Sequence, residues 1–335
     1  MRKRKKVVVI GGGTGTYTAL MGLKKYSNLD LSVIVSMMDD GGSNRVIRDE
    51  FGLLPTSDLR QCMVALASED SDQTLRKLFT YRYNAGTGIS GMTFGNLFMA
   101  ALTDIYKGNQ DKAIKETCEI LGVRGEIIPV TFDSVHLMAK YENGIQVLGE
   151  RDIDEPDQKQ GKYRIVELEI VPKAKVNSNA IKAISKADLI VLGPGDFYTS
   201  ILPNLVVDEV SEAINRSKAK TVFVLNLMTR FGQTVGFKAS DFLDELKNYM
   251  QGGKLDYCLV NNSNEFPKGV LTRYKKENAR PVKDDLGKIY GKTKIIRRNL
   301  ISNKVYEKVK SDKLARSLIR HDYSKLAKAI FGLLS

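Results

Sequence analysis

A glycine-rich turn, residues 11–15, follows the apolar run Val7–Ile10 and precedes a helix-like pattern. A strand, a turn and a helix in this order place backbone N–H groups at the helix start, where they bind anions. The dinucleotide fingerprint G-x-G-x-x-G fails because Thr16 stands in its third glycine place, and the GK[ST] of a Walker A loop is absent. We therefore expect a phosphate-binding turn, with a turn needed only for packing as the alternative, made of Gly11, Gly12, Gly13, Thr14 and Gly15.

Three carboxylates are candidates for binding magnesium. Asp39 and Asp40 end the second expected strand just before two glycines and a serine. Asp58 comes directly after Pro55-Thr56-Ser57. Magnesium is usually held by one or two carboxylates together with the phosphates of a ligand. The alternatives are a single acid that holds a ribose and, for Asp58, an acid that stabilises the first turn of a helix.

Two later stretches offer hydroxyl and amide groups. In "GPGDFYTSILPN", Gly193, Pro194 and Gly195 form a turn, and Tyr198, Thr199 and Ser200 follow at an expected helix start. In "NLMT", the amide of Asn226 and the hydroxyl of Thr229 suit neutral groups of a sugar or a base. These residues favour a diphosphate or a sugar as the ligand, and Arg45, Arg48 and Arg60 are candidate phosphate partners.

These stretches are positioned by an alternation of strand-like and helix-like segments. Apolar runs predict parallel strands at about 6–10, 31–37, 188–192, 221–226 and 256–260, and each run ends in a glycine, aspartate or asparagine cluster. Residues 124–172 instead predict a β-rich insertion with a hairpin at Asn143-Gly144. We expect one α/β domain over 1–335, Rossmann-like and doubly wound, with a mainly parallel sheet whose carboxyl ends meet at one ligand site.

Composition narrows the class of protein. The 335 residues carry a formal charge of +13, but the basic residues are scattered and no nucleic-acid-binding signature accompanies them, so we expect no nucleic-acid partner. No run reaches the roughly 20 apolar residues of a membrane span, and no leader sequence is recognisable, so we expect a cytoplasmic protein. Two histidines and three widely spaced cysteines argue against a histidine-dependent triad and a zinc site.

The motifs "VVVIGGGTGT", "MMDDGGSNRVIRDEFGLLPTSDLRQCMVAL", "GNLFMAALTDI", "ADLIVLGPGDFYTSILPNLVV" and "LNLMTRFGQTVGF" together resemble the gluconeogenesis factor (YvcK-like) family. That family lies in the CofD-like superfamily with 2-phospho-L-lactate transferase, and the resemblance runs from about residue 6 to 330. Through the shared motifs it adds Asn96, Asn204 and Met228 to the candidate ligand-binding residues. The sequence departs from the pattern at Met92, Phe94 and Asp196, where His, Leu and Ser are expected.

The resemblance implies a Rossmann-like bacterial protein that binds UDP-sugars, notably UDP-N-acetylglucosamine. It also implies a role in growth on gluconeogenic carbon sources and in cell shape and wall maintenance, with protein partners in those processes and a homo-oligomer left open. The alternative is a magnesium-dependent transferase that uses a nucleoside diphosphate, and the resemblance to that branch implies magnesium at Asp39, Asp40 or Asp58. An NAD(P)-dependent oxidoreductase is disfavoured by the failed fingerprint. Whether the protein is an enzyme stays open, with a nucleotide-sugar-binding regulator favoured over a transferase, and no catalytic residue is assigned.

Overall fold

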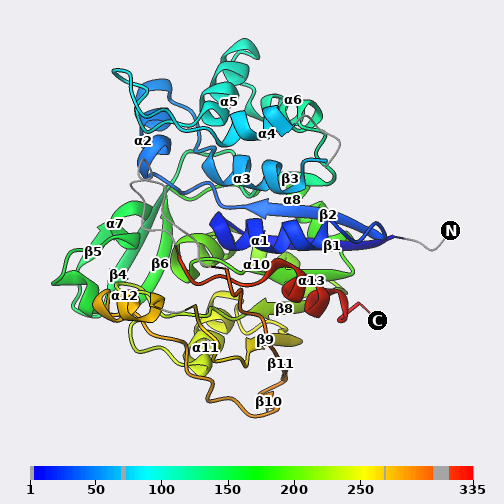
Figure 1. Cartoon of the computed structure of the whole chain (residues 1–335), viewed down its shortest axis with the longest axis vertical. Helices are drawn as coiled ribbons and strands as arrows, with labels where there is room; N and C mark the ends of the chain where they lie inside the picture. Colours follow the sequence, from blue (N-terminus) through cyan, green and yellow to red (C-terminus); the bar gives the residue numbers. More distant parts are fainter. Residues whose placement is uncertain (1–3, 69–72, 268, 305–316, 335) are drawn as a thin grey trace.

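A large, mainly parallel sheet organises the protein (Figure 1). The computed structural model describes residues 4–68, 73–267, 269–304 and 317–334. Within these residues the strand order is β10-β11-β9-β8-β7-β1-β2-β3, and all neighbours pair in parallel except β10 and β11. The strands are β1 Lys5–Gly11, β2 Leu29–Val35, β3 Glu126–Pro129, β7 Leu189–Leu192, β8 Lys220–Val224, β9 Tyr257–Asn261, β10 Ile289–Tyr290 and β11 Thr293–Arg298. The expected fold class is confirmed, as are the five predicted strands to within two residues at each end.

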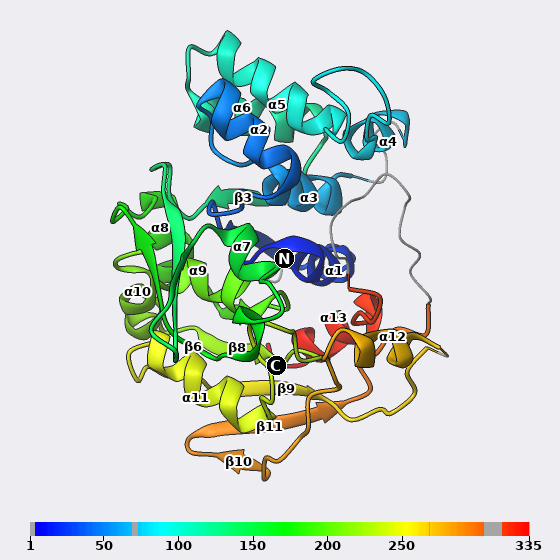
Figure 2. The same cartoon turned by 90° about the vertical axis from the view of Figure 1, so that its left-hand side faces the viewer.

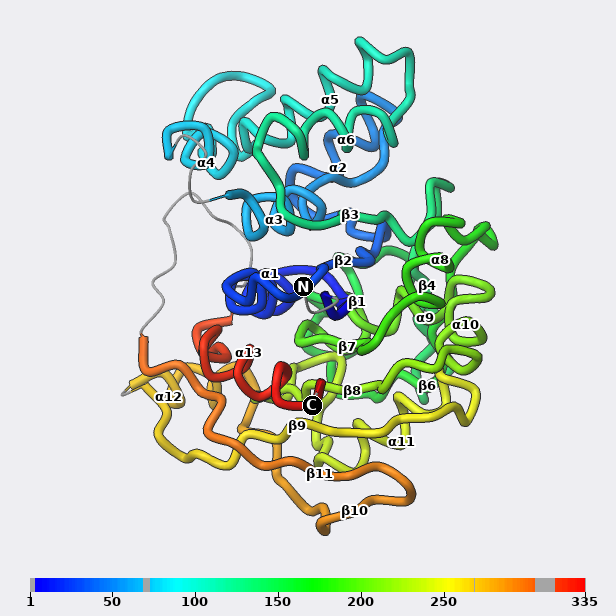
Figure 3. The backbone as a smooth tube through the Cα atoms, turned by 90° about the vertical axis from the view of Figure 1, so that its right-hand side faces the viewer, coloured from blue at the N-terminus to red at the C-terminus, as the bar shows by residue number. Residues whose placement is uncertain are grey.

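The central strands are continuous apolar runs because helices cover both faces of the sheet. Val7 to Ile10, Val33 to Val35 and Leu189 to Leu192 are almost fully buried. Figure 3 shows one helical layer on each side of the strands. One layer contains α1 Gly13–Leu23, α3 Ser57–Leu66 and α13 Tyr323–Phe331, and the other contains α8 Ser178–Lys186, α9 Leu202–Leu205, α10 Val210–Arg216 and α11 Ala239–Tyr249.

A helical region lies between β2 and β3 in the sequence and above the sheet in Figure 1. Besides α3 it contains α2 Gly42–Phe51, α4 Gln73–Thr80, α5 Phe94–Ile105 and α6 Gln110–Ile120. This region matters for the site because α2 and α3 begin at the polar clusters around Gly42 and Ser57.

A second, three-stranded antiparallel sheet lies inside the predicted β-rich insertion. Its order is β5-β4-β6, with β4 His136–Tyr141, β5 Gln146–Leu148 and β6 Ile165–Val171, and the short helices α7 Glu150–Asp154 and η1 Gln160–Lys162 connect β5 to β6. The expected range of 124–172 includes β3, which instead pairs in parallel with β2 in the large sheet. The small sheet therefore starts at His136. Figure 2 shows α7 beside the amino end of α1.

The direction in which the strands are added reverses between β1 and β7. From β1 the chain adds β2 and then β3 on one side, and from β7 it adds β8 and β9 on the other. Ligands of open parallel sheets bind outside the carboxyl ends of the strands at such a reversal. In Figure 1 this end of the sheet is on the left, beside α7 and α12 Val270–Lys276. Among the described residues, no helix is both long and apolar enough to cross a membrane.

Candidate functional site

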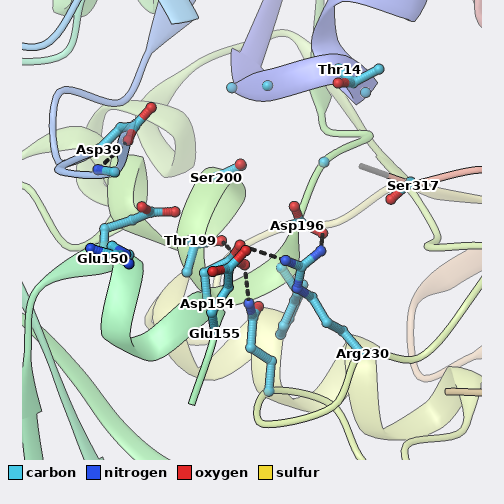
Figure 4. Close-up of a pocket in the computed structure, with 18 of the residues that line it drawn as sticks. Thr14, Asp39, Glu150, Asp154, Glu155, Asp196, Thr199, Ser200, Arg230 and Ser317 are labelled. Carbon is cyan, nitrogen blue, oxygen red and sulfur yellow. Dashed lines mark hydrogen bonds and ion pairs between the residues drawn. The ribbon is translucent and has the colours of Figure 1, made fainter. Parts of the chain in front are cut away.

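A cleft of about 660 Å³ lies at the carboxyl ends of β1, β7 and β8, a volume typical of small-molecule sites. Figure 4 shows side chains from both halves of the sheet directed into it. Many of the residues predicted from the sequence line this cleft. They are Gly12, Gly13, Thr14, Gly15, Pro194, Gly195, Thr199, Ser200, Asn226, Met228 and Thr229, together with Asp39, Asp58 and Arg60.

The glycine turn delivers an uncapped helix start to the cleft. Gly12 is the extended N-cap residue of α1, and the first turn contains no acidic residue. Among the described residues, no side chain caps this end. Gly13 has a φ of 62°, a conformation that favours glycine. A Cβ on Gly15 would lie 2.4 Å from the carbonyl oxygen of Pro194, so glycine lets the two turns touch. The free N–H groups and the positive end of the helix dipole favour an anion here.

Hydroxyl and amide groups face this helix start from the other half of the sheet. Thr199 and Ser200 lie in the π-helical turn η2 Phe197–Ile201. The Asn226 side-chain amide donates a 2.7 Å hydrogen bond to the carbonyl of Gly195, whereas its oxygen Oδ1 is buried without a partner among the described residues. Thr229 is less available, because its hydroxyl accepts the backbone N–H of Arg280 at 3.0 Å. The orphaned Asn226 oxygen is therefore the acceptor that a ligand donor would satisfy.

Five predicted ligand-binding residues support the cleft from behind rather than line it. Gly11 and Gly193 lie within the strand-to-turn junctions. Asn96 donates to the hydroxyls of Ser43 and Ser57, at 2.9 and 3.0 Å, and so ties the first turns of α2 and α3 to α5. The hydroxyl of Tyr198 is directed away, to Glu245 at 2.8 Å, and the amide of Asn204 donates to the carbonyl of Ser200 at 2.8 Å.

The three arginines proposed as phosphate partners are separated in the structure. Arg60 lines the cleft, but its Nε donates to Asn96 Oδ1 at 3.0 Å and its side chain is almost fully buried. Arg45 forms an exposed pair with Asp49. Arg48 donates to the backbone carbonyl of Val135 at 2.9 Å, outside the residues that line the cleft.

Two of the three carboxylates predicted to bind magnesium line the cleft, and the third does not. Asp39 and Asp58 line the cleft, and an added Cβ on Gly12 would lie 2.3 Å from an Asp58 oxygen, so Asp58 contacts the glycine turn. Asp40 is directed away, because its Oδ1 accepts the backbone N–H of Arg151 at 2.9 Å. Asp40 is not among the residues that line the cleft, and its role as a magnesium ligand stays a prediction. Asp40 instead holds the start of α7 against the loop after β2.

α7 contributes an acidic side chain that the sequence analysis misses. Glu150 lines the cleft opposite Asp39 (Figure 4), and both side chains are half-buried. Burial, with repulsion from Asp58, raises the pKa of Asp39 to about 7. Burial, with repulsion from Asp39, raises the pKa of Glu150 well above its ordinary value. This side of the cleft therefore favours a proton or a bound cation.

An ion-pair network occupies the next part of the cleft. The Arg230 guanidinium contacts the carboxylate of Asp154, at the end of α7, and that of Asp196 at 3.3 Å. Gln233 also donates to Asp154, at 2.7 Å. Burial raises the pKa of Asp154 to about 6, although Arg230 lowers it. Asp196, a departure from the family pattern, is thus matched by a cation.

Magnesium fits Asp39 and Asp58 only together with a ligand. In the described part of the chain, no three His, Cys, Asp or Glu side chains are close enough to hold a metal ion by themselves. Magnesium commonly takes one or two carboxylates, and ligand phosphates complete its coordination. A phosphate at the start of α1 would lie beside Asp58, which contacts Gly12. The donor set therefore suits a cation that arrives with a phosphorylated ligand.

Two sequence signals mark the residues that the analysis missed. Glu150 and Asp154 belong to the acid-rich run "ERDIDEPD", which directly follows the predicted hairpin. Arg230 immediately follows the "NLMT" motif. The acid-rich run does not indicate that α7 contacts the loop after β2. That contact depends on how the small sheet packs against the large one.

Comparisons with known proteins agree with the motifs. Residues 7–301 match the family model described as 2-phospho-L-lactate transferase CofD. A protein of Thermoanaerobacterium thermosulfurigenes is 42% identical over 332 residues, which are 98% of this chain and 97% of that protein. The gluconeogenesis factor of Bacillus subtilis is 35% identical over 335 residues, and the alignment covers 100% of this chain and 99% of that protein.

The solved structures give the same result for the fold. A crystal structure of a Bacillus halodurans protein superposes with a TM-score of 0.88 at 36% identity, over 98% of this chain and 100% of that one. A second structure from the same species, described as a member of the UPF0052 family, has a TM-score of 0.87 at 36% identity, over 98% and 99% of the two chains. From its motifs, its relatives and its fold, the chain belongs to the gluconeogenesis factor family, within the larger CofD family.

Proposed function

We propose that the protein is a regulator that binds a UDP-sugar, UDP-N-acetylglucosamine, in the cleft at the carboxyl ends of β1 and β7. The observation that carries this proposal is the uncapped start of α1 at Gly13, which faces Ser200 across the reversal of strand order. The diphosphate binds there, and the unpartnered oxygen of Asn226 accepts a hydrogen bond from a neutral group of the ligand. The names of the relatives support a role in gluconeogenic growth.

In this function the protein acts in the cytoplasm, where its ligand is a precursor for wall synthesis. Protein partners that maintain cell shape bind it differently with and without the UDP-sugar. Asp39 and Asp58 are the residues that would hold magnesium when it accompanies the diphosphate, and the cation would then neutralise charge beside the phosphates. Arg230 keeps Asp154 and Asp196 paired, so these two carboxylates do not repel the ligand.

The second candidate function is a magnesium-dependent transferase that uses a nucleoside diphosphate. The acidic side of the cleft, with Asp39, Asp58 and Glu150, favours it, as does the match to the CofD model. In that reaction this chain would bind the phosphates at Gly13 and position the metal ligands, as in the regulator, but it would also need an acceptor substrate.

Calorimetric titration with UDP-N-acetylglucosamine, GDP, ATP and NAD, each with and without magnesium, separates the candidates. The regulator binds UDP-N-acetylglucosamine more tightly than the other three and leaves it intact after hours of incubation. Preferential binding of GDP, or release of a phosphate-containing product in the presence of magnesium, identifies a transferase. Preferential binding of NAD contradicts both.

A further inference from the structure

A second groove lies at the opposite end of the large sheet, where the strands begin. It has a volume of about 1150 Å³ and lies between the amino ends of β1 and β2, the carboxyl end of α1, the residues after α3, and α8. Figure 3 faces this end of the molecule. We call it the basic groove after the residues that line it, namely Arg4, Lys6, Lys24, Lys25, Arg124, Lys182 and Lys186.

Positive charge in the basic groove is only partly balanced. Two carboxylates also line it. Asp30 pairs with Arg4 at 3.5 Å, and Glu126 accepts from the Ser32 hydroxyl at 3.5 Å. Within the described residues the ammonium groups of Lys6, Lys182 and Lys186 have no carboxylate partner. The described residues that line the groove therefore carry a net positive charge that an anionic occupant would neutralise.

Helix-end electrostatics explain only some of these cations. Lys24 and Lys186 lie at the carboxyl ends of α1 and α8, where a cation stabilises the helix dipole. Lys6 lies on a strand, Arg124 lies in the connection before β3, and Lys182 lies in the middle of α8. Residues from separate parts of the chain thus bring positive charge to one groove without a common structural reason.

The donors in the basic groove suit carboxylates along a peptide better than a phosphate. Phosphate sites typically use free N–H groups at a helix start or paired arginine contacts. Here α1 contributes its carboxyl end, and at the start of α8 the side chain of Asn177 accepts the backbone N–H of Asn179. Five of the seven cations are lysines, which act as point charges on flexible stems.

We propose that the basic groove docks an acidic segment of a partner protein. Docking there leaves the nucleotide cleft open, because the two sites lie at opposite ends of the same strands. The sites nevertheless share α1, which has Gly13 at the cleft and Lys24 next to its last turn. This inference does not depend on which nucleotide binds in the cleft.

The test measures fluorescence anisotropy of the full chain with a labelled twelve-residue peptide of repeating Asp-Glu-Leu. The double variant Lys182→Glu/Lys186→Glu reverses two charges of the basic groove. The matched control Lys292→Glu/Lys294→Glu removes the same charge from exposed positions at the β10–β11 edge. A Lys182→Gln/Lys186→Gln variant replaces the first double variant if that one does not fold.

We expect saturable peptide binding that the groove variant weakens at least tenfold and the control changes less than twofold. The peptide should still bind when UDP-N-acetylglucosamine saturates the cleft. Equal loss in both double variants would overturn the proposal, since binding would then depend only on net charge. Absence of wild-type binding at 0.1 mM peptide would also overturn it. Displacement of the peptide by tripolyphosphate or a single-stranded oligonucleotide at a lower concentration than by unlabelled peptide would assign the groove to a different anion.

Discussion

Replacing Asp39 with asparagine should stabilise the folded protein, although the residue lies in the candidate site. The carboxylate is half-buried beside Asp58 and Glu150, and its pKa is raised from 3.8 to about 7. A carboxyl group whose pKa is higher in the folded state binds protons more tightly there than in the unfolded state. Between these two pKa values the free energy of unfolding therefore falls as the pH rises.

These pKa values give the expected size of the effect. The unfavourable contribution of Asp39 grows by about 3 kcal/mol between pH 4.5 and pH 8, because each unit of pKa difference corresponds to about 1.4 kcal/mol. For a chain of 335 residues this corresponds to about 4 °C in melting temperature. Asp39→Asn should therefore raise the melting temperature by that much more at pH 8 than at pH 4.5.

The assay is thermal unfolding of both proteins across this pH range, without magnesium or nucleotide. The matched control is Asp40→Asn, which weakens the acceptor for the Arg151 N–H and should lower the melting temperature. An Asp39→Asn gain that is constant with pH would refute the reasoning. A gain of equal size in the Asp40 variant would show that any loss of charge from this loop has the same effect.

Four further predictions concern the cleft. Gly13→Ala should cost about 1 kcal/mol of stability, because an alanine is strained at the φ of 62°. It should also weaken UDP-N-acetylglucosamine binding more than tenfold in calorimetry, because the methyl group projects toward Ser200. Unchanged affinity in the folded variant contradicts the anion site. Asn226→Ala should weaken the same ligand by about 1–3 kcal/mol without unfolding the chain, and an equal loss for NAD would contradict a specific contact. Arg230→Met should cost about 3 kcal/mol in urea unfolding at pH 8 and less at pH 5, where Asp154 takes up a proton, and equal losses would refute this charge pairing. Binding of the nucleotide at pH 7.5 without magnesium should take up protons, measured as a dependence of the binding enthalpy on the ionisation enthalpy of the buffer, and no such dependence would show that the acidic side is not coupled to the ligand.

The sequence predicts the large sheet well because each central strand can be recognised from its own residues. Each central strand is a continuous run of buried apolar residues, because helices cover both faces of the sheet. Each run ends in a polar or glycine cluster, because the candidate site lies at the carboxyl ends of the strands. The short strand β3 is different. Its four residues contain only two consecutive isoleucines between a glutamate and a proline, which gives no indication of its partner. The prediction therefore groups it with the hairpin, whereas it pairs with β2.

Prediction of the candidate site is less complete, because part of the site is formed by packing between segments that are distant in the sequence. Residue type and spacing identify the glycine turn, Asp39, Ser200 and Asn226, all of which lie in the connections that follow strands of the large sheet. They do not identify Glu150, because it reaches the cleft only when α7 packs against the loop after β2. Adjacency in sequence is also misleading for Asp40, whose carboxylate faces α7 while that of Asp39 faces the cleft.

The charges of the cleft connect the two candidate functions. Asp154 and Asp196 are balanced by Arg230, but burial and repulsion from neighbouring carboxylates raise the pKa of Asp39 and of Glu150. A diphosphate at the start of α1 adds negative charge beside Asp58, so its binding is favourable only if a cation or protons accompany it. A regulator and a transferase would therefore share the same coupling between nucleotide, proton and magnesium, and what distinguishes them is whether an acceptor molecule can reach the bound diphosphate.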